Sequence, residues 1–178
     1  MSDFIGHTEA YDTALLVARL WLGGMMFAHG VRHVQSVRSG PGMAQWFESL
    51  GLRNGRLQAM NVTLTELVFG ATVVLGLATP LSYGAVASIV LVALMTAHRK
   101  NGFFINNPGQ GYEYVATIAV LSVVFAMLGP GEWSLDHAIG WEFPFQPWTA
   151  LVVALVVGVG GTAVFLGTFW RPKTVEQG

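Results

Sequence analysis

The chain has 178 residues, of which 53% are hydrophobic and only 11% charged, whereas soluble domains carry about 25% charged residues, so the composition argues against a soluble protein. Nine Lys and Arg residues against ten Asp and Glu residues leave no basic stripe for nucleic acid, and we expect no nucleic-acid partner. The absence of cysteine excludes disulfides, thiolate nucleophiles and metal sites with cysteine ligands. A redox role would therefore require a bound cofactor.

Five apolar runs are each long enough to cross a bilayer as a helix, which takes about 20 residues. In lipid, an unbroken apolar run satisfies its own backbone hydrogen bonds only as an α-helix. The sequence therefore predicts an all-α membrane protein with a single domain over residues 1–178. The five predicted spans are residues 13–31, 57–78, 81–97, 112–129 and 147–170. The first twelve residues lack the basic start and cleavage site of a signal peptide, so we expect the first span to stay in the mature protein.

The segments between the spans have patterns of their own. Between the first two spans, apolar residues recur three and four positions apart, which predicts a short interfacial helix that ends near Gly51. Those residues are Met43, Trp46, Phe47 and Leu50. Only Thr79 and Pro80 separate the second and third spans, which predicts a tight antiparallel hairpin. The sequence also predicts two interfacial loops. One is residues 98–111, which are rich in Gly and Asn, and the other is residues 130–146, which are rich in aromatic residues.

The basic residues predict the orientation. With five spans, the loops 32–56 and 98–111 and the C-terminal tail share one side of the membrane. Eight of the nine Lys and Arg residues lie on that side, and the ninth, Arg19, lies inside a span. Cytoplasmic loops carry the excess of basic residues, so we expect the N-terminus outside and the C-terminus in the cytoplasm.

A series of motifs points to a family. The stretch RLWLGGMMFAHGVRHV contains an Arg-Leu pair, then glycine, then His-Gly and a basic residue. It is followed, in this order, by WFESLGL, ELVFGATVVLGLATP, HRKNGFF, GYEY and GPGEWSLD. Over residues 15–137 this series resembles the DoxX family of membrane proteins. The resemblance implies a four-helix bundle, to which this chain adds a fifth, C-terminal transmembrane helix that we expect to serve an added partner.

The resemblance also implies a setting. Some DoxX relatives look like small membrane subunits of oxidoreductases, including one that passes electrons from thiosulfate to quinone. By that resemblance we expect a bacterial or archaeal cytoplasmic membrane, with membrane lipid and other protein subunits as partners. The sequence leaves a homo-oligomer open.

Two charged residues lie deep inside the spans. Counted at about 1.5 Å per residue, Arg19 and Glu66 are separated by roughly 6 Å along the membrane normal, within reach of two long side chains. An unpaired charge near the bilayer centre costs several kcal/mol, so both should face the bundle interior, and we predict that they pair. Three interpretations stay open: an ion pair that fixes helix packing, a ligand or proton site, and a charge that reaches water.

His29 and His33 lie four residues apart and therefore on one helical face. Such a pair is able to bind a metal or a haem iron. The pair falls in the last turn of its helix, however, where cationic and amphipathic side chains are common, and we predict no metal site.

Titratable and aromatic residues from four helices collect at the cytoplasmic end. A rim of this kind, with Phe103 and Phe104 nearby, suits a quinone head, because His or Tyr donates to its oxygens and a carboxylate moves protons. The alternative is a polar network that closes the bundle. The candidate residues are His29, His33, Glu66, His98, Tyr112 and Glu113.

The outer loop contains Ser134, Asp136 and His137. A hydrolase triad is disfavoured, because triad members converge from separate positions in space, and the catalytic residues, if any, are unknown. We predict that Ser134 caps a short helix with His137 at the capping-box position. The acidic character of the loop makes Ser134 and Asp136 candidate contacts for an extracytoplasmic partner.

The last span carries Ala154, Gly158 and Thr162 at four-residue spacing. Small residues at this spacing let helix backbones approach closely in lipid. The stripe packs either on the protein's own helices or on another chain, and Gly158 and Thr162 are therefore candidate partner contacts.

Three functions follow from these observations. The leading one is a small membrane subunit of a redox complex that binds a quinone or a lipid-like ligand. The second is a non-catalytic scaffold or anchor for partner proteins, and the third is a small-solute carrier with Arg19 and Glu66 as its midplane site.

Overall fold

The computed structural model describes residues 9–141 and 146–172. This part of the chain is helical and contains no strand, as predicted. Four of its helices are long and apolar enough to cross a membrane. They are α1 (Glu9–Arg38), α3 (Gly55–Leu75), the helix Thr79–Asn101 that contains α4 (Thr79–Ala93), and the helix Pro147–Phe169 that contains α7 (Pro147–Leu155) and α8 (Gly161–Phe169).

The remaining predicted span is α5 (Glu113–Leu128), an apolar helix of 16 residues that is shorter than the other four. It falls short of the predicted 112–129 because Tyr112 only caps the helix and Gly129, at a φ of 86°, ends it before Pro130. By length and composition, the described residues therefore contain four candidate spans, one fewer than predicted.

The connecting elements follow the predictions closely. α2 (Gly42–Ser49) is the short helix expected before Gly51. α3 and α4 form the tight hairpin, with Pro80 in the first turn of α4. A third short helix, α6 (Leu135–Ala138), lies in the outer loop.

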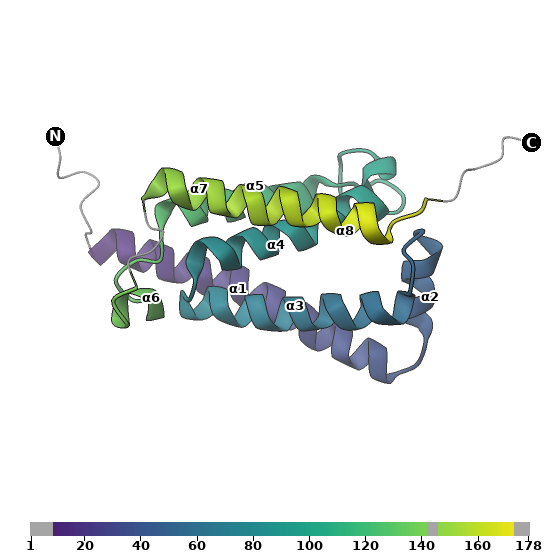
Figure 1. Cartoon of the computed structure of the whole chain (residues 1–178), viewed down its shortest axis with the longest axis horizontal. Helices are drawn as coiled ribbons and strands as arrows, with labels where there is room; N and C mark the ends of the chain where they lie inside the picture. The colour runs from purple at the N-terminus through teal and green to yellow at the C-terminus, as the bar shows by residue number, and fades with distance from the viewer. Residues whose placement is uncertain (1–8, 142–145, 173–178) are drawn as a thin grey trace, which may run out of the picture.

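The long helices run side by side along the longest axis of the molecule (Figure 1). α4 is central, because it packs against α3, against α5 and against the helix that contains α7 and α8. α1 packs along α3. α6 lies at the end where α1 begins, and α2 lies at the opposite end, near the end of α8 (Figure 1).

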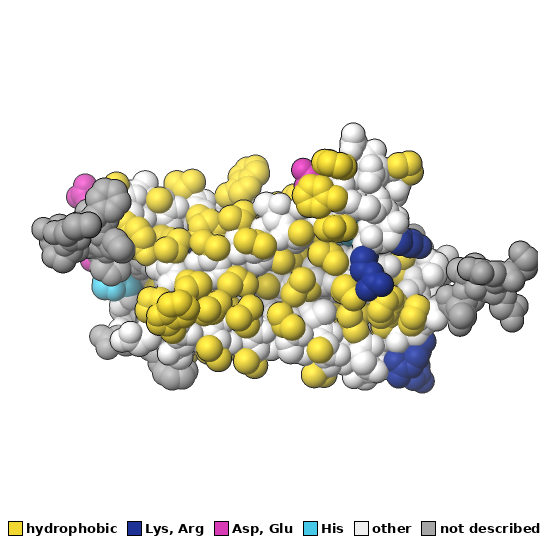
Figure 2. Space-filling model, turned by 90° about the horizontal axis from the view of Figure 1, so that it is seen from above, with side chains coloured by type: hydrophobic (Ala, Val, Ile, Leu, Met, Phe, Trp, Pro, Cys, Tyr) yellow, Lys and Arg dark blue, Asp and Glu magenta, His cyan; other side chains and the backbone are white. Residues whose placement is uncertain are grey.

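The sides of the bundle are apolar, and the Lys and Arg side chains visible on its surface in Figure 2 lie at one end. Trp21, Trp148 and Val164 are 76%, 74% and 71% exposed, which suits contact with lipid better than contact with water. In Figure 2, hydrophobic side chains cover the middle of the visible face, and the visible Lys and Arg side chains gather at the end of the molecule where α8 ends.

The end of α8 is tied to the loop that precedes α3. The Arg53 amide donates to the Phe169 carbonyl at 2.9 Å, and the Arg171 amide donates to the Gly51 carbonyl at 2.8 Å. The Trp170 indole N–H donates to the Leu50 carbonyl at 2.9 Å. α3 and α8 are thus joined at the basic end of the molecule, although each packs on α4 along its length.

Two adjacent glycines of α1 allow a test of the α1–α3 packing. A Cβ at Gly23 would lie 2.7 Å from the Gly70 carbonyl oxygen and the Val74 amide, whereas a Cβ at Gly24 would meet nothing within 4 Å. We expect Gly23→Ala to lower the free energy of unfolding by about 1–3 kcal/mol through overpacking. Gly24→Ala should be neutral or stabilise the helix by up to about 1 kcal/mol. Thermal unfolding of the two detergent-purified variants checks this, and equal melting temperatures would contradict the close approach.

Candidate functional site

A cavity of about 670 Å³ lies between the helices at the end of the bundle that carries α2. Its volume is in the range of roughly 300–1,000 Å³ that is typical of small-molecule sites. The walls are mostly apolar and come mainly from α1, α2, α3, α4, α5 and α8. Apolar lining residues include Met26, Val62, Phe69, Ile89, Val92, Ile118 and Phe165. Asn61 of α3 and Gly161 of α8 line the cavity and are also exposed, so the cavity reaches the outer surface between these two helices.

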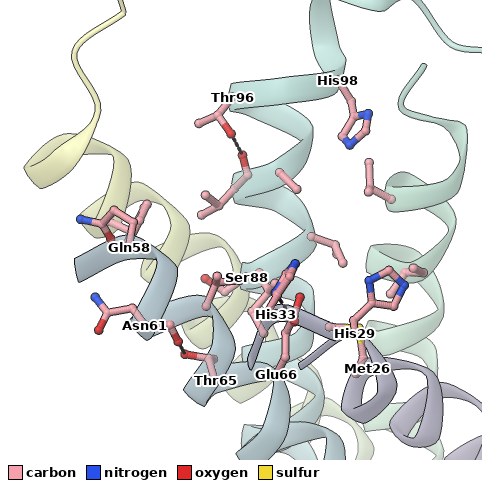
Figure 3. Close-up of a pocket in the computed structure, with 18 of the residues that line it drawn as sticks. Met26, His29, His33, Gln58, Asn61, Thr65, Glu66, Ser88, Thr96 and His98 are labelled. Carbon is pink, nitrogen blue, oxygen red and sulfur yellow. Dashed lines mark hydrogen bonds and ion pairs between the residues drawn. The ribbon is translucent and has the colours of Figure 1, made fainter. Parts of the chain in front are cut away.

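Four of the six predicted rim residues line this cavity: His29, His33, Glu66 and His98. His33 of α1 and Glu66 of α3 are in contact, with His33 Nδ1 2.8 Å from Glu66 Oε2. This is an ion-pair distance, but the two groups lack the alignment of a hydrogen bond, and both atoms are buried without a hydrogen-bond partner. Figure 3 shows the two side chains side by side, with His29 next to them.

His98 faces the cavity from the end of the central helix (Figure 3). It closes η1, a π-helical turn over Leu94–His98, and its Nδ1 lies 2.9 Å from the Gln110 carbonyl oxygen. π-Helical turns are rare and often occur at functional sites. A second one, η3 (Val156–Gly160), contributes Val157 to the opposite side of the cavity.

The other two rim residues do not line the cavity. The Glu113 carboxylate accepts a hydrogen bond from the Ile105 amide at 3.0 Å and so holds the loop before α5. The Tyr112 ring packs edge to face on Phe103, with the ring centroids 5.5 Å apart. Tyr114 lines the cavity in their place, and its hydroxyl lies 2.6 Å from Met25 Sδ.

The sequence analysis missed a polar stripe on α3, which consists of Gln58, Asn61 and Thr65 and leads to Glu66. All four residues line the cavity. Gln58, Asn61 and Thr65 are three and four residues apart and share one helical face, and Glu66 lies two turns after Gln58. The pattern is therefore visible in the sequence, although the three residues of the stripe are uncharged. Gln58 is buried, and its Oε1 has no hydrogen-bond partner.

The predicted pair of Arg19 and Glu66 is wrong. Arg19 is 1% exposed and donates to the carbonyl oxygens of Val74 and Trp133, at the end of the bundle opposite the cavity. The cause is the register of α1 on α3, in which Gly30 packs against Leu67, the neighbour of Glu66. Arg19 lies about three turns before Gly30, which is roughly 17 Å along the helix.

The two partner-contact candidates in the outer loop serve the chain itself. Ser134 caps α6 and accepts from the His137 amide at 3.2 Å, which confirms the predicted cap. Asp136 is 0% exposed and accepts from the Ala78 amide, the Thr79 amide and the Thr79 hydroxyl at 2.8, 3.0 and 2.7 Å. Because both side chains are buried within the chain, neither is available for the expected contact with a partner.

The stripe on the last helix packs on α4. A Cβ at Gly158 would lie 3.2 Å from the Cβ of Ala87, and the Thr162 hydroxyl lies 3.3 Å from the Ser88 hydroxyl. Of the two interpretations left open, these contacts favour packing on the protein's own helices. Gly158 and Thr162 therefore contact α4 of the same chain.

The described residues contain no group of three or more His, Asp and Glu side chains that could hold a metal ion. Glu66 is the one acid that lines the cavity beside its three histidines. The cavity offers ring nitrogens, amides, hydroxyls and one carboxylate to an organic ligand.

Comparison with known proteins gives one match. Residues 14–99, which include most of α1 and all of α2, α3 and α4, match the model of the DoxX family. Neither a comparison with curated proteins nor one with solved structures finds a match. The matched segment contributes most of the cavity wall, whereas α5 and the C-terminal helix lie outside it.

Proposed function

Since the match over residues 14–99 makes this chain a DoxX family membrane protein, we propose that it is a small membrane subunit of a redox complex and that its cavity binds a quinone. The observation that carries the proposal is the division of the cavity into polar and apolar parts. The buried Glu66 carboxylate meets the half-buried His33 ring, and most of the remaining lining is apolar. An amphipathic molecule with a small polar head matches this division.

The polar part of the cavity fits a quinone head. Its carbonyl oxygens need donors, and the ring nitrogens of His29, His33 and His98 and the amide of Asn61 are available in the lining. When bound, a quinone accepts two electrons and two protons. The electrons would come from a redox centre in a partner subunit, while Glu66 and the histidines would hold protons beside the head.

The apolar part of the cavity fits an isoprenoid tail. Val62 of α3 and Phe165 of α8 line the side on which exposed Asn61 and Gly161 bring the cavity to the outer surface. A tail that leaves between α3 and α8 would pass directly into lipid. The alternative of a small-solute carrier loses its midplane site, because Arg19 and Glu66 lie at different levels of the bundle.

A cavity-filling variant tests the ligand. Val92 lines the cavity, and Val164 points to the outside of α8 at 71% exposure. We expect Val92→Trp to reduce quinone co-purified in mild detergent at least tenfold, because the larger ring occupies the site, while Val164→Trp retains the wild-type amount. Extraction followed by mass spectrometry measures the quinone. Equal amounts in both variants, or no quinone in the wild type together with a co-purifying protein, would favour the scaffold function.

We also propose that α5 crosses the membrane, so that the chain spans it five times with its N-terminus outside. The support is that α5 connects opposite ends of the bundle. The Tyr11 hydroxyl at the start of α1 donates to the Leu128 carbonyl at the end of α5, at 2.6 Å, and Glu113 begins α5 beside the loop that follows α4. Sixteen residues cover about 24 Å, a short but feasible crossing when the bilayer thins locally.

Reporter fusions test this topology. A fusion after Gly140 should report the external compartment, and a fusion at the C-terminus should report the cytoplasm, since eight of nine basic residues fall on the C-terminal side. A fusion within the loop 102–111 should agree with the C-terminus. The same compartment for Gly140 and the loop 102–111, which flank α5, would show that α5 does not cross the membrane.

A further inference from the structure

Glu66 and His33 are an unusual pair for a membrane helix bundle. Glu66 is 5% exposed, and its Oε2 atom lies 2.8 Å from His33 Nδ1 with neither atom in a hydrogen bond. A buried carboxylate without hydrogen bonds is unfavourable as an isolated charge. The pair is therefore stable either as a protonated carboxyl beside a neutral ring or as a carboxylate beside an imidazolium, and these two forms differ only in the position of one proton.

A polar route leads from this pair toward the basic end of the molecule. Gln58, Asn61 and Thr65 share one face of α3, Glu66 lies two turns after Gln58, and all four side chains line the cavity. Gln58 lies one turn before Asn61 on the same face, and its unpartnered Oε1 is available to water in the cavity. From Gln58 to Glu66 the route is about 12 Å long.

The charged and titratable groups around the pair are few. α1 contributes His29, whose ring lies 6.5 Å from that of His33, the end of the central helix contributes His98, and α5 contributes Tyr114. The lining residues from α2 and α8 are apolar or glycine: Trp46, Phe47, Gly161 and Phe165. The pair thus has one carboxylate and no permanently charged neighbour among the lining residues.

We infer that Glu66 and His33 form a proton-exchange site that the polar stripe Gln58, Asn61 and Thr65 connects to the cytoplasmic end of the molecule. One proton moves between Glu66 Oε2 and His33 Nδ1, and the pair takes up or releases one proton at a time through the stripe. This role does not require a quinone, so it goes beyond the proposed function. In a quinone-binding protein the same site would supply protons to the reduced head.

Infrared spectroscopy of the full chain in lipid nanodiscs tests the site. Across the pH range in which carboxyl and imidazole groups titrate, the wild type should show a carboxyl C=O band that Glu66→Gln removes and imidazole bands that change at the same pH. His33→Asn should remove the imidazole change that accompanies the Glu66 band and leave the signals of the other four histidines. If Glu66→Gln leaves the carboxyl signals intact, or if the wild type shows no such titration, the proton-exchange site is refuted whether or not quinone binds.

Exchange in D₂O tests the route. We expect the double variant Asn61→Leu/Thr65→Val to slow deuteration of the Glu66 carboxyl at least tenfold. Thr117→Val is the matched control, because Thr117, like Thr65, donates to its own helix four residues back but does not line the cavity. Wild-type exchange in the double variant would overturn the stripe as the route, and slowing in Thr117→Val would show that the effect is not specific to it.

Discussion

Asp136→Ala should lower the free energy of unfolding by about 3–5 kcal/mol. A hydrogen bond to a charged group contributes about 1.5–3 kcal/mol, and Asp136 accepts three such bonds, although their effects are not additive. These bonds join the outer loop to the first turn of α4. They also hold Ala78, a non-glycine residue at a φ of 49°, in the α3–α4 turn.

Thermal unfolding of the detergent-purified protein measures this loss. Asp136→Asn keeps the shape and one acceptor oxygen, so it should fall between alanine and the wild type. Glu132→Ala is the matched control, because Glu132 is an exposed acid of the same loop. If Asp136→Ala and Glu132→Ala had the same small effect, the carboxylate would have no role in holding the loop.

Arg19→Leu should be almost as damaging, whereas Glu66→Leu should change stability by about 1 kcal/mol or less. Arg19 donates to two carbonyl groups, and its loss would leave the Val74 and Trp133 carbonyls unpaired in a buried site, at about 1–3 kcal/mol each. Glu66 has no hydrogen bond to lose at Oε2, and the His33 ring that remains carries no charge in its neutral form, so Glu66→Leu leaves no buried charge unpaired.

The double variant separates this account from a direct Arg19–Glu66 pair. Residues that share no partner behave additively to within about 0.3–0.5 kcal/mol. Arg19→Leu/Glu66→Leu should therefore be as unstable as the sum of the single variants predicts. Partial rescue in the double variant would indicate that the two side chains meet after all.

The sequence predicted the helices well because the signal there is local. Apolar runs, Pro80 and the Trp46 and Phe47 spacing each reflect a few neighbouring residues. The last residue of α5 is set by the conformation of Gly129, which has a φ of 86°. From the sequence alone, a Gly-Pro pair after an apolar run does not identify the last helical residue. The helix α5, Glu113–Leu128, still agrees with the predicted span 112–129 to one residue at each end.

The site was predictable in part for a related reason. Antiparallel helices bring His29, Glu66 and His98 to one end whatever the side-chain details, and the structure places all three around one cavity. The partners of Arg19 were not predictable, because the Trp133 carbonyl reaches it only through the fold of the outer loop. Counting residues from estimated helix ends also misplaced Arg19, since the side-by-side register of α1 and α3 depends on the glycine contacts between them.

Photoaffinity labelling tests the central claim most directly. A quinone with a photoreactive group on its tail, added to the protein in lipid nanodiscs, should label peptides from α3 and α8 that line the cavity, and an excess of unmodified quinone should abolish the labelling. Val92→Trp should lose the label and Val164→Trp should keep it. Labelling spread over lipid-facing residues such as Trp21 and Trp148, without competition by unmodified quinone, would contradict a quinone site in the cavity.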